Sequence, residues 1–195
     1  GYERVVGFSI KSELGMPPTL LNAGKTTNFT YIVENLDKKL ISRINSIDSH
    51  RKIKDRINAI ITNGGRLIFD SMDNEIFRTN LTMIDSQMPI IVAHMLIGYY
   101  QEDKSTCSDL SDYISRKDPL SRSRVFYKHK IKEMLSAVAL GMKPATEWDG
   151  TEEASGGYII VKTNGDVLAY HIYNRDAFRK YLLNNTKLES AGSDR

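Results

Sequence analysis

Hydrophobic and polar residues alternate in two different periods along this chain, which predicts a mixture of strands and helices. Period-two alternation over 5–12 predicts an opening strand, in which Val6, Phe8 and Ile10 form the face that anchors it in the core. Near the other end, two apolar runs flank Asn164 and Gly165, which predicts a β-hairpin with a type I′ turn. Two further strands are predicted at 28–33 and 66–70.

Helical periodicity covers most of the remaining chain. Asn35 or Asp37 is predicted to cap a long helical region that breaks near Ser49 and ends at Gly64. Ser123 is predicted to cap a helix that ends at Gly141. Other helices are predicted at 84–100, 108–116 and 174–183. The order of elements is not a regular βαβ repeat, so the predicted fold class is α+β, with a mixed central β-sheet flanked by helices.

Composition narrows the class of protein. Hydrophobic residues make up 41% and charged residues 26% of the 195 residues, which is enough to form a core in one globular domain over 1–195. The single cysteine, Cys107, excludes an intrachain disulfide and a cysteine-based zinc cluster. No apolar run approaches the length of a membrane span, so the expected location is cytoplasmic, with no membrane partner. The net charge of +3 permits a nucleic-acid partner without demanding one.

The second face of the opening strand carries Gly7, Ser9 and Lys11, an unusual set for a buried surface. A glycine inside a strand often marks close approach by a ligand or another backbone. Magnesium-dependent nucleases often place an acid and a lysine two residues apart, because residues i and i+2 share one strand face and point together at the scissile phosphate. Lys11 fits the lysine position, and Ser9 stands at the acid position. An exposed structural lysine is the commoner meaning of such a residue.

Four stretches resemble Type II restriction endonucleases of the HpaII kind, a divergent branch of the PD-(D/E)xK nucleases. They are GFSIKSELGMPPTLLNAGKTTNFTYIV (7–33), NLTMIDSQMPIIVAHMLIGYY (80–100), KIKEMLSAVALGM (130–142) and GGYIIVKTNGDVLAYHIYNRDAFRKYLLNNTKLES (156–190). The resemblance implies a restriction-endonuclease-like fold, Mg²⁺-dependent cleavage of double-stranded DNA at a short specific sequence, and a cognate DNA methyltransferase as genetic partner. It also implies a chain that begins partway through such an enzyme and that can be incomplete at its C-terminal end as well.

Two departures from the family pattern concern the acids. Ser9 replaces the usual acid, and only Glu3 precedes it as a carboxylate. Glu13 lies two residues beyond Lys11 and shares its face if the strand continues, which makes it the candidate metal ligand. A glutamate at the start of a helix is the commoner interpretation of Glu13. The predicted catalytic set is therefore Lys11, Ser9 and Glu13.

Polar and basic residues supply the candidate DNA contacts. Small polar side chains with one lysine follow the Pro17–Pro18 break, and an asparagine either binds adenine edges or caps a turn. Arg124, Lys128 and Lys132 are spaced as one stripe on a helix, which is either a solvated face or a surface that follows DNA phosphates. A second basic cluster spans 51–56. The predicted contacts are Thr19, Asn22, Lys25, Thr26, Asn28, Arg124, Lys128, Lys132, Arg175 and Lys187.

Three functions remain open at this point. The first is a magnesium-dependent restriction endonuclease, for which a homodimer is one expected assembly. The second is a DNA-binding module without catalysis, which Ser9 favours. The third is an interaction domain that uses the apolar segment around 90–97 at a subunit interface.

Overall fold

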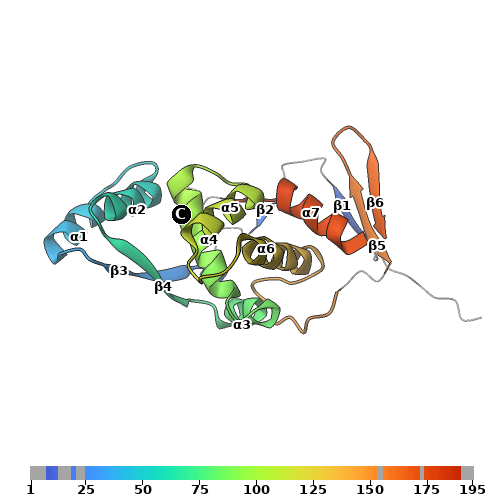
Figure 1. Ribbon diagram of the computed structural model, residues 1–195, viewed down its shortest axis with the longest axis horizontal. Coiled ribbons are helices and arrows are strands. Elements are labelled where there is room, and N and C mark those ends of the chain that lie inside the picture. The colour runs from blue at the N-terminus through green and yellow to red at the C-terminus, as the bar shows by residue number, and fades with distance from the viewer. Residues whose placement is uncertain (1–7, 13–18, 21–24, 153–155, 172–173, 190–195) are drawn as a thin grey trace, which may run out of the picture.

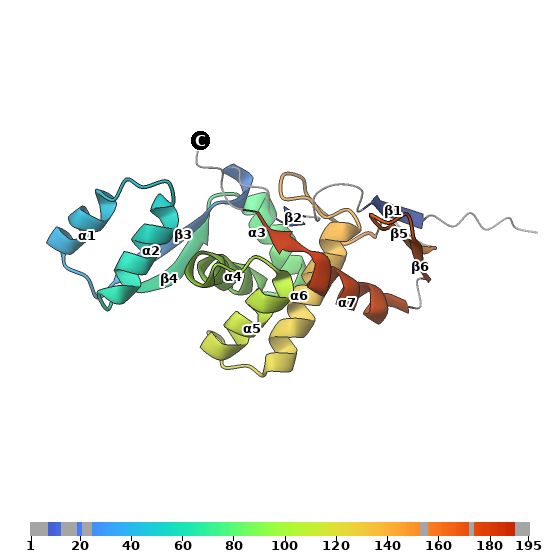
Figure 2. The same cartoon turned by 90° about the horizontal axis from the view of Figure 1, so that it is seen from above.

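The computed structural model describes residues 8–12, 19–20, 25–152, 156–171 and 174–189. Both views show three parts in a row along the long axis (Figures 1 and 2). One end holds α1, α2 and the β3-β4 ribbon, the middle holds α3 to α6, and the other end holds α7 beside the β1-β5-β6 sheet. The strands form three separate sheets, ordered β1-β5-β6, β2-β7 and β3-β4.

The first end is an antiparallel ribbon with two helices. Its elements are β3 (Phe29–Glu34), β4 (Arg66–Met72), α1 (Lys38–Asn45) and α2 (Lys52–Thr62). The predicted cap is confirmed at Asp37, whose carboxylate accepts from the Leu40 amide at 2.7 Å. The break in the helical region and its stop at Gly64, with φ +81°, are also confirmed. The Tyr31 hydroxyl donates to the Ala93 carbonyl at 2.8 Å and so ties the ribbon to the central helices.

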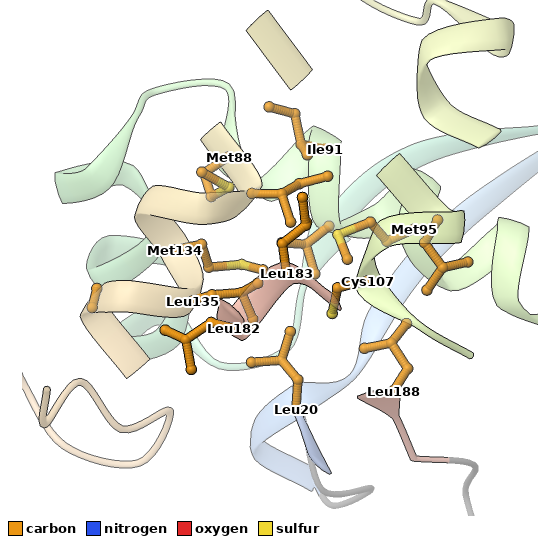
Figure 3. Packing of buried hydrophobic residues seen from close by; sticks show 14 of the residues in the cluster. Leu20, Met88, Ile91, Met95, Cys107, Met134, Leu135, Leu182, Leu183 and Leu188 are labelled. Carbon is orange, nitrogen blue, oxygen red and sulfur yellow. The ribbon is translucent and has the colours of Figure 1, made fainter. Parts of the chain in front are cut away.

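The middle part contains the hydrophobic core. It comprises α3 (Glu75–Ile84), α4 (Met88–Glu102), α5 (Cys107–Lys117) and α6 (Arg124–Ala139). Figure 3 shows side chains from α4, α5, α6, α7, β2 and β7 meeting there. The predicted cap of α6 is confirmed, since the Ser123 hydroxyl accepts from the Phe126 amide. Its predicted apolar stripe is buried at Tyr127, Ile131, Met134 and Leu135, and Val138 is half-buried.

Helix α4 is buried within this chain. Ile91, Val92, Ala93 and Met95 have no exposed surface, because α2, α3, α5, α6 and β4 pack around the helix. The prediction that this segment forms a subunit interface is therefore wrong: its apolar surface is used by the chain's own core. None of the described helices is long and apolar enough to cross a membrane by itself; α3 and α4 together meet that test on length and composition only, with a bend of 107° between them.

The second end is a mixed sheet covered on one face. Strand β1 (Phe8–Ser12) pairs in parallel with β5 (Gly157–Val161), and β5 pairs antiparallel with β6 (Val167–His171). Helix α7 (Arg175–Asn185) packs on one face, where the rings of Tyr158 and Phe178 stack with centroids 3.7 Å apart. Short strands β2 (Thr19–Leu20) and β7 (Lys187–Leu188) join this end to the core.

The other face of this sheet is open, which corrects the predicted role of the first strand. Phe8 is 46% and Ile10 67% exposed, and Val167 on the same face is 60% exposed. Val6 lies outside the described residues. Alternation correctly divides the strand into two faces, but α7 covers the face that contains Tyr158 and Ile160 instead of the one that contains Phe8. The prediction that Phe8 and Ile10 anchor the strand in the core is therefore wrong.

The α+β class is confirmed, and the predicted central sheet is not. The mixed sheet lies at one end of the molecule, and most of the core is formed between helices (Figure 1). The hairpin is confirmed, but its loop has three residues, with the Lys162 amide donating to the Asp166 carbonyl at 2.8 Å. Only Gly165 in this loop has positive φ, at +86°, so a type I′ turn, which needs two such residues, is not formed.

Candidate active site

The predicted catalytic strand is present, at an edge of the mixed sheet. Ser9 pairs with Tyr158 of β5, and Lys11 pairs with Ile160. Both partners have buried side chains on the face that α7 covers. Glu13 lies outside the described residues. The structure thus places the backbone at Ser9 and Lys11 beside β5, one strand away from residues that face α7.

Four charged or polar groups gather where β5 meets the start of α7. Glu152 accepts a hydrogen bond from Arg175 and forms an ion pair with it. Tyr158 has no exposed surface, and its hydroxyl lies near Glu152, Arg175 and Arg179. We call Glu152, Tyr158, Arg175 and Arg179 the α7 cluster. Of these four residues, only Arg175 was predicted from the sequence.

The α7 cluster has an excess of positive charge. Burial, and after it the Glu152 carboxylate, raises the pKa of the Tyr158 hydroxyl, while the two guanidinium groups oppose that change. Tyr158 is therefore a neutral hydrogen-bonding group at neutral pH, and two arginines face one carboxylate. Such a set binds anions more readily than cations.

Two features of the sequence could have indicated part of the α7 cluster. Arg175 and Arg179 are four residues apart, so they share one side of the closing helix. Tyr158 follows the Gly156–Gly157 pair at the start of a strand. Glu152 has no local pattern that marks it, because its pairing with Arg175 depends on the path of the loop before β5.

The predicted polar contacts occupy two places. Thr19 pairs with Lys187 between β2 and β7, so two predicted DNA-binding residues become neighbours. Lys25 and Thr26 lie in the 3₁₀ helix η1 (Lys25–Thr27). The Asn28 side chain donates to the Asp73 carboxylate at 3.2 Å, so it helps to hold the end of the ribbon. Asn22 lies outside the described residues.

The stripe on α6 is largely paired with α5. Arg124 and Lys128 lie 2.8 and 3.2 Å from the Asp112 carboxylate. Lys132, which is half-buried, forms no ion pair with any residue that the structure describes. This geometry favours a structural role for Arg124 and Lys128 in joining the two helices.

The second basic cluster is also partly used within the fold. Lys54 pairs with Asp103, and the Arg56 guanidinium donates to the carbonyls of Asn45 and Ile47 at 2.7 and 2.9 Å. The Arg56 bonds fix the turn between α1 and α2, and the Lys54 pair joins α2 to the end of α4.

A magnesium site is not formed by the described residues. No three His, Cys, Asp or Glu side chains in that part of the chain lie close enough to share a metal ion. Glu152, a carboxylate near Tyr158 of β5, is neutralised by Arg175. The described side chains therefore do not fit the metal that the predicted chemistry requires, and Glu13 remains a predicted ligand outside them.

Two comparisons with known proteins give matches. The family model described as HpaII restriction endonuclease matches residues 1–195. A curated relative, the Type II restriction enzyme HpaII of Haemophilus parainfluenzae, is 43% identical over the whole chain. The chain spans 55% of the length of that relative. No solved structure matches the chain.

Proposed function

Because this chain belongs to the HpaII restriction endonuclease family, we propose that it forms part of an enzyme that cleaves double-stranded DNA at a short specific sequence. The observation that carries the proposal is the match of the family model to the whole chain. The relative is a Type II restriction enzyme, and hydrolysis of phosphodiester bonds at a specific sequence is the reaction that we propose for this chain's enzyme. Nucleophilic attack on a phosphodiester builds negative charge on the phosphoryl oxygens, and a fixed cation beside them stabilises the transition state.

The geometry supports this function at one end of the molecule. Strand β1 brings the backbone of Lys11 beside β5, and the α7 cluster brings two guanidinium groups to the same sheet. We assign Lys11 to stabilising charge on the scissile phosphate, with Ser9 beside it on the strand. A divalent metal supplies an activated water when it is bound, and Mg²⁺ with Glu13 as a ligand remains a proposal.

A DNA-binding module without cleavage is the second candidate. Serine at position 9, where the pattern has an acid, favours it, as does the lack of a metal cluster among the described residues. A homodimer, a cognate methyltransferase as genetic partner and a cytoplasmic location stay predictions for either function.

Plasmid cleavage separates the two candidates. We expect the full-length protein to cut plasmid DNA into discrete fragments with Mg²⁺, and to shift duplex DNA in gels with Ca²⁺ without cutting it. Binding should weaken steeply with salt, since each phosphate contact contributes about −0.9 to the slope of log affinity on log salt. A gel shift without cleavage would favour the binding module. The absence of both binding and cleavage would contradict both functions.

Asn22 and Asn28, which precede β3 in the sequence, test the predicted recognition of DNA bases. We expect Asn22→Ala and Asn28→Ala to reduce discrimination between the cognate site and a site changed by one base pair, by about 1–3 kcal/mol for a lost bidentate base contact. Competition binding with both duplexes measures this discrimination. Asp73→Ala is the control, because it removes the intramolecular partner of Asn28 and leaves Asn28 in place. If Asp73→Ala reproduces the loss seen in Asn28→Ala, Asn28 acts by positioning the ribbon instead.

A further inference from the structure

Two arginines of α7 are held near one another with only one carboxylate to balance them. Arg175 and Arg179 are one helical turn apart, and both guanidinium groups act on the Tyr158 hydroxyl. Like charges at this spacing destabilise a helix unless an anion accompanies them. Glu152 pairs with Arg175, whereas Arg179 has no ion pair with any described residue. The α7 cluster therefore has one cation more than its described partners neutralise.

The same cluster contains polar atoms that lack partners. The Nε atoms of Arg175 and Arg179 and the hydroxyl of Tyr158 are buried, and none forms a hydrogen bond within the described part of the chain. Arg175 is near enough to lower the pKa of Tyr158, yet no hydrogen bond of normal geometry joins them. Buried polar groups in folded proteins nearly always have a partner, and one left unpaired costs about 1–3 kcal/mol. Three such donors in one cluster indicate a ligand with several acceptor oxygens.

We propose that Arg175 and Arg179 bind one phosphate of the DNA backbone, and that Glu152 holds Arg175 until the phosphate displaces it. This inference rests on the proposed function and adds the residues that receive the substrate. A phosphate has the charge that the cluster lacks, and its oxygens match the planar donor fork of arginine. Arg175 and Glu152 are partly exposed, at 43% and 30% of their side chains, so DNA can reach them.

The position of the cluster relates the phosphate to the candidate catalytic strand. Tyr158 pairs with Ser9, and neighbouring strands lie about 5 Å apart. The Tyr158 hydroxyl that lies near both arginines therefore belongs to the strand next to the one that carries Lys11. Helix α7 lies beside the β1-β5-β6 sheet in both views, which agrees with this placement (Figures 1 and 2).

The first test compares neighbouring residues of α7. Arg179→Met removes one charge and keeps an apolar stem, and Lys180→Met does the same at an exposed residue that has no ion pair with a described residue. We expect Arg179→Met to weaken duplex binding in Ca²⁺ about tenfold and to reduce the salt slope by about 1. Lys180→Met should change both quantities much less. Equal effects of the two variants on a protein that binds and cleaves DNA would overturn the phosphate site.

The second test concerns Glu152. Glu152→Gln frees Arg175, so we expect tighter DNA binding than in the wild type, by about three- to tenfold. Glu147→Gln makes the same change of charge at an exposed residue of the same loop and should have a smaller effect. If both glutamine variants behave alike, Glu152 does not compete with the phosphate.

Inorganic phosphate separates failure of this site from failure of the proposed function. We expect phosphate to raise the Tm of the wild type above that in chloride at equal ionic strength, and Arg179→Met to abolish the rise. A rise that depends on Arg179 supports the site even if no DNA is cut, in which case only the proposed cleavage fails. No rise in the wild type, together with equal binding by the two methionine variants, contradicts the site.

Discussion

Replacing Lys11 with alanine is expected to slow DNA cleavage by about two to three orders of magnitude, which is the usual effect of removing one preorganised charge from a transition state. DNA affinity should change little, because the lysine stabilises charge that develops during the reaction. The Tm should also change little, since alanine keeps the backbone pairing of β1 with β5. Single-turnover cleavage at saturating enzyme, in the full-length protein with Mg²⁺, is the measurement.

A matched variant controls for the loss of charge itself. Lys162 directly follows β5 in the same sheet and forms no ion pair with a described residue. Lys162→Ala should cleave at close to the wild-type rate. A wild-type rate in Lys11→Ala would remove the catalytic assignment from β1, and a fall in Tm in place of a fall in rate would make Lys11 a structural residue.

The second large effect is expected at Asn80, which is 1% exposed and joins α3 to the loop before β5. Its Nδ2 donates to the carbonyls of Lys143 and Thr146 at 3.0 and 2.8 Å, and its Oδ1 accepts from the Trp148 amide at 3.0 Å. Asn80→Ala removes the side-chain partner of three partly buried backbone groups. At about 1 kcal/mol for each lost bond, the free energy of unfolding should fall by about 3 kcal/mol. For a chain of this size, the Tm should then fall by about 6–12 °C.

Urea and thermal unfolding followed by circular dichroism measure this effect. Asn185→Ala is the control, because Asn185 is exposed and makes a single hydrogen bond to the Tyr181 carbonyl. Its loss should cost less than about 1 kcal/mol. The loop continues past Trp148, whose indole donates to the Thr151 carbonyl beside Glu152. Asn80→Ala should therefore also disturb the α7 cluster, and an unchanged Tm would show that the loop is held by other contacts.

Helices were predicted better than the contacts between distant segments, because capping residues and apolar stripes lie within the helical segment itself. For α6, the cap at Ser123, the stop before Gly141 and the apolar stripe all lie within the segment itself, so short-range chemistry defined the helix. Helix α3 was missed although its signal was present, since Asn74 accepts from the Phe77 amide at 2.8 Å as a normal N-cap. The prediction followed the apolar run that begins at Ile84 and placed the start of a helix there. In the structure Ile84 is the last residue of α3.

Pairings between distant segments were not predictable in the same way. The stripe on α6 was visible from spacing, but its partner Asp112 lies on another helix, and only the packing of α5 against α6 brings them together. The two faces of β1 were visible from alternation, but which face is covered depends on where α7 docks. The same reason explains the α7 cluster, in which Glu152 and Arg175 meet only after the loop and the helix are in place.

The pairing of β1 also sets the order in which this end of the protein can form during synthesis. Phe8 pairs with Gly157, so the first described strand waits for a partner that leaves the ribosome after all the central helices. At about 5–20 residues per second, that wait lasts roughly seven to thirty seconds. Strand β2 waits still longer, because its partner β7 follows α7. An unfinished chain thus holds Lys11 on an unpaired segment, and the site that we propose for DNA is not assembled until synthesis has passed α7.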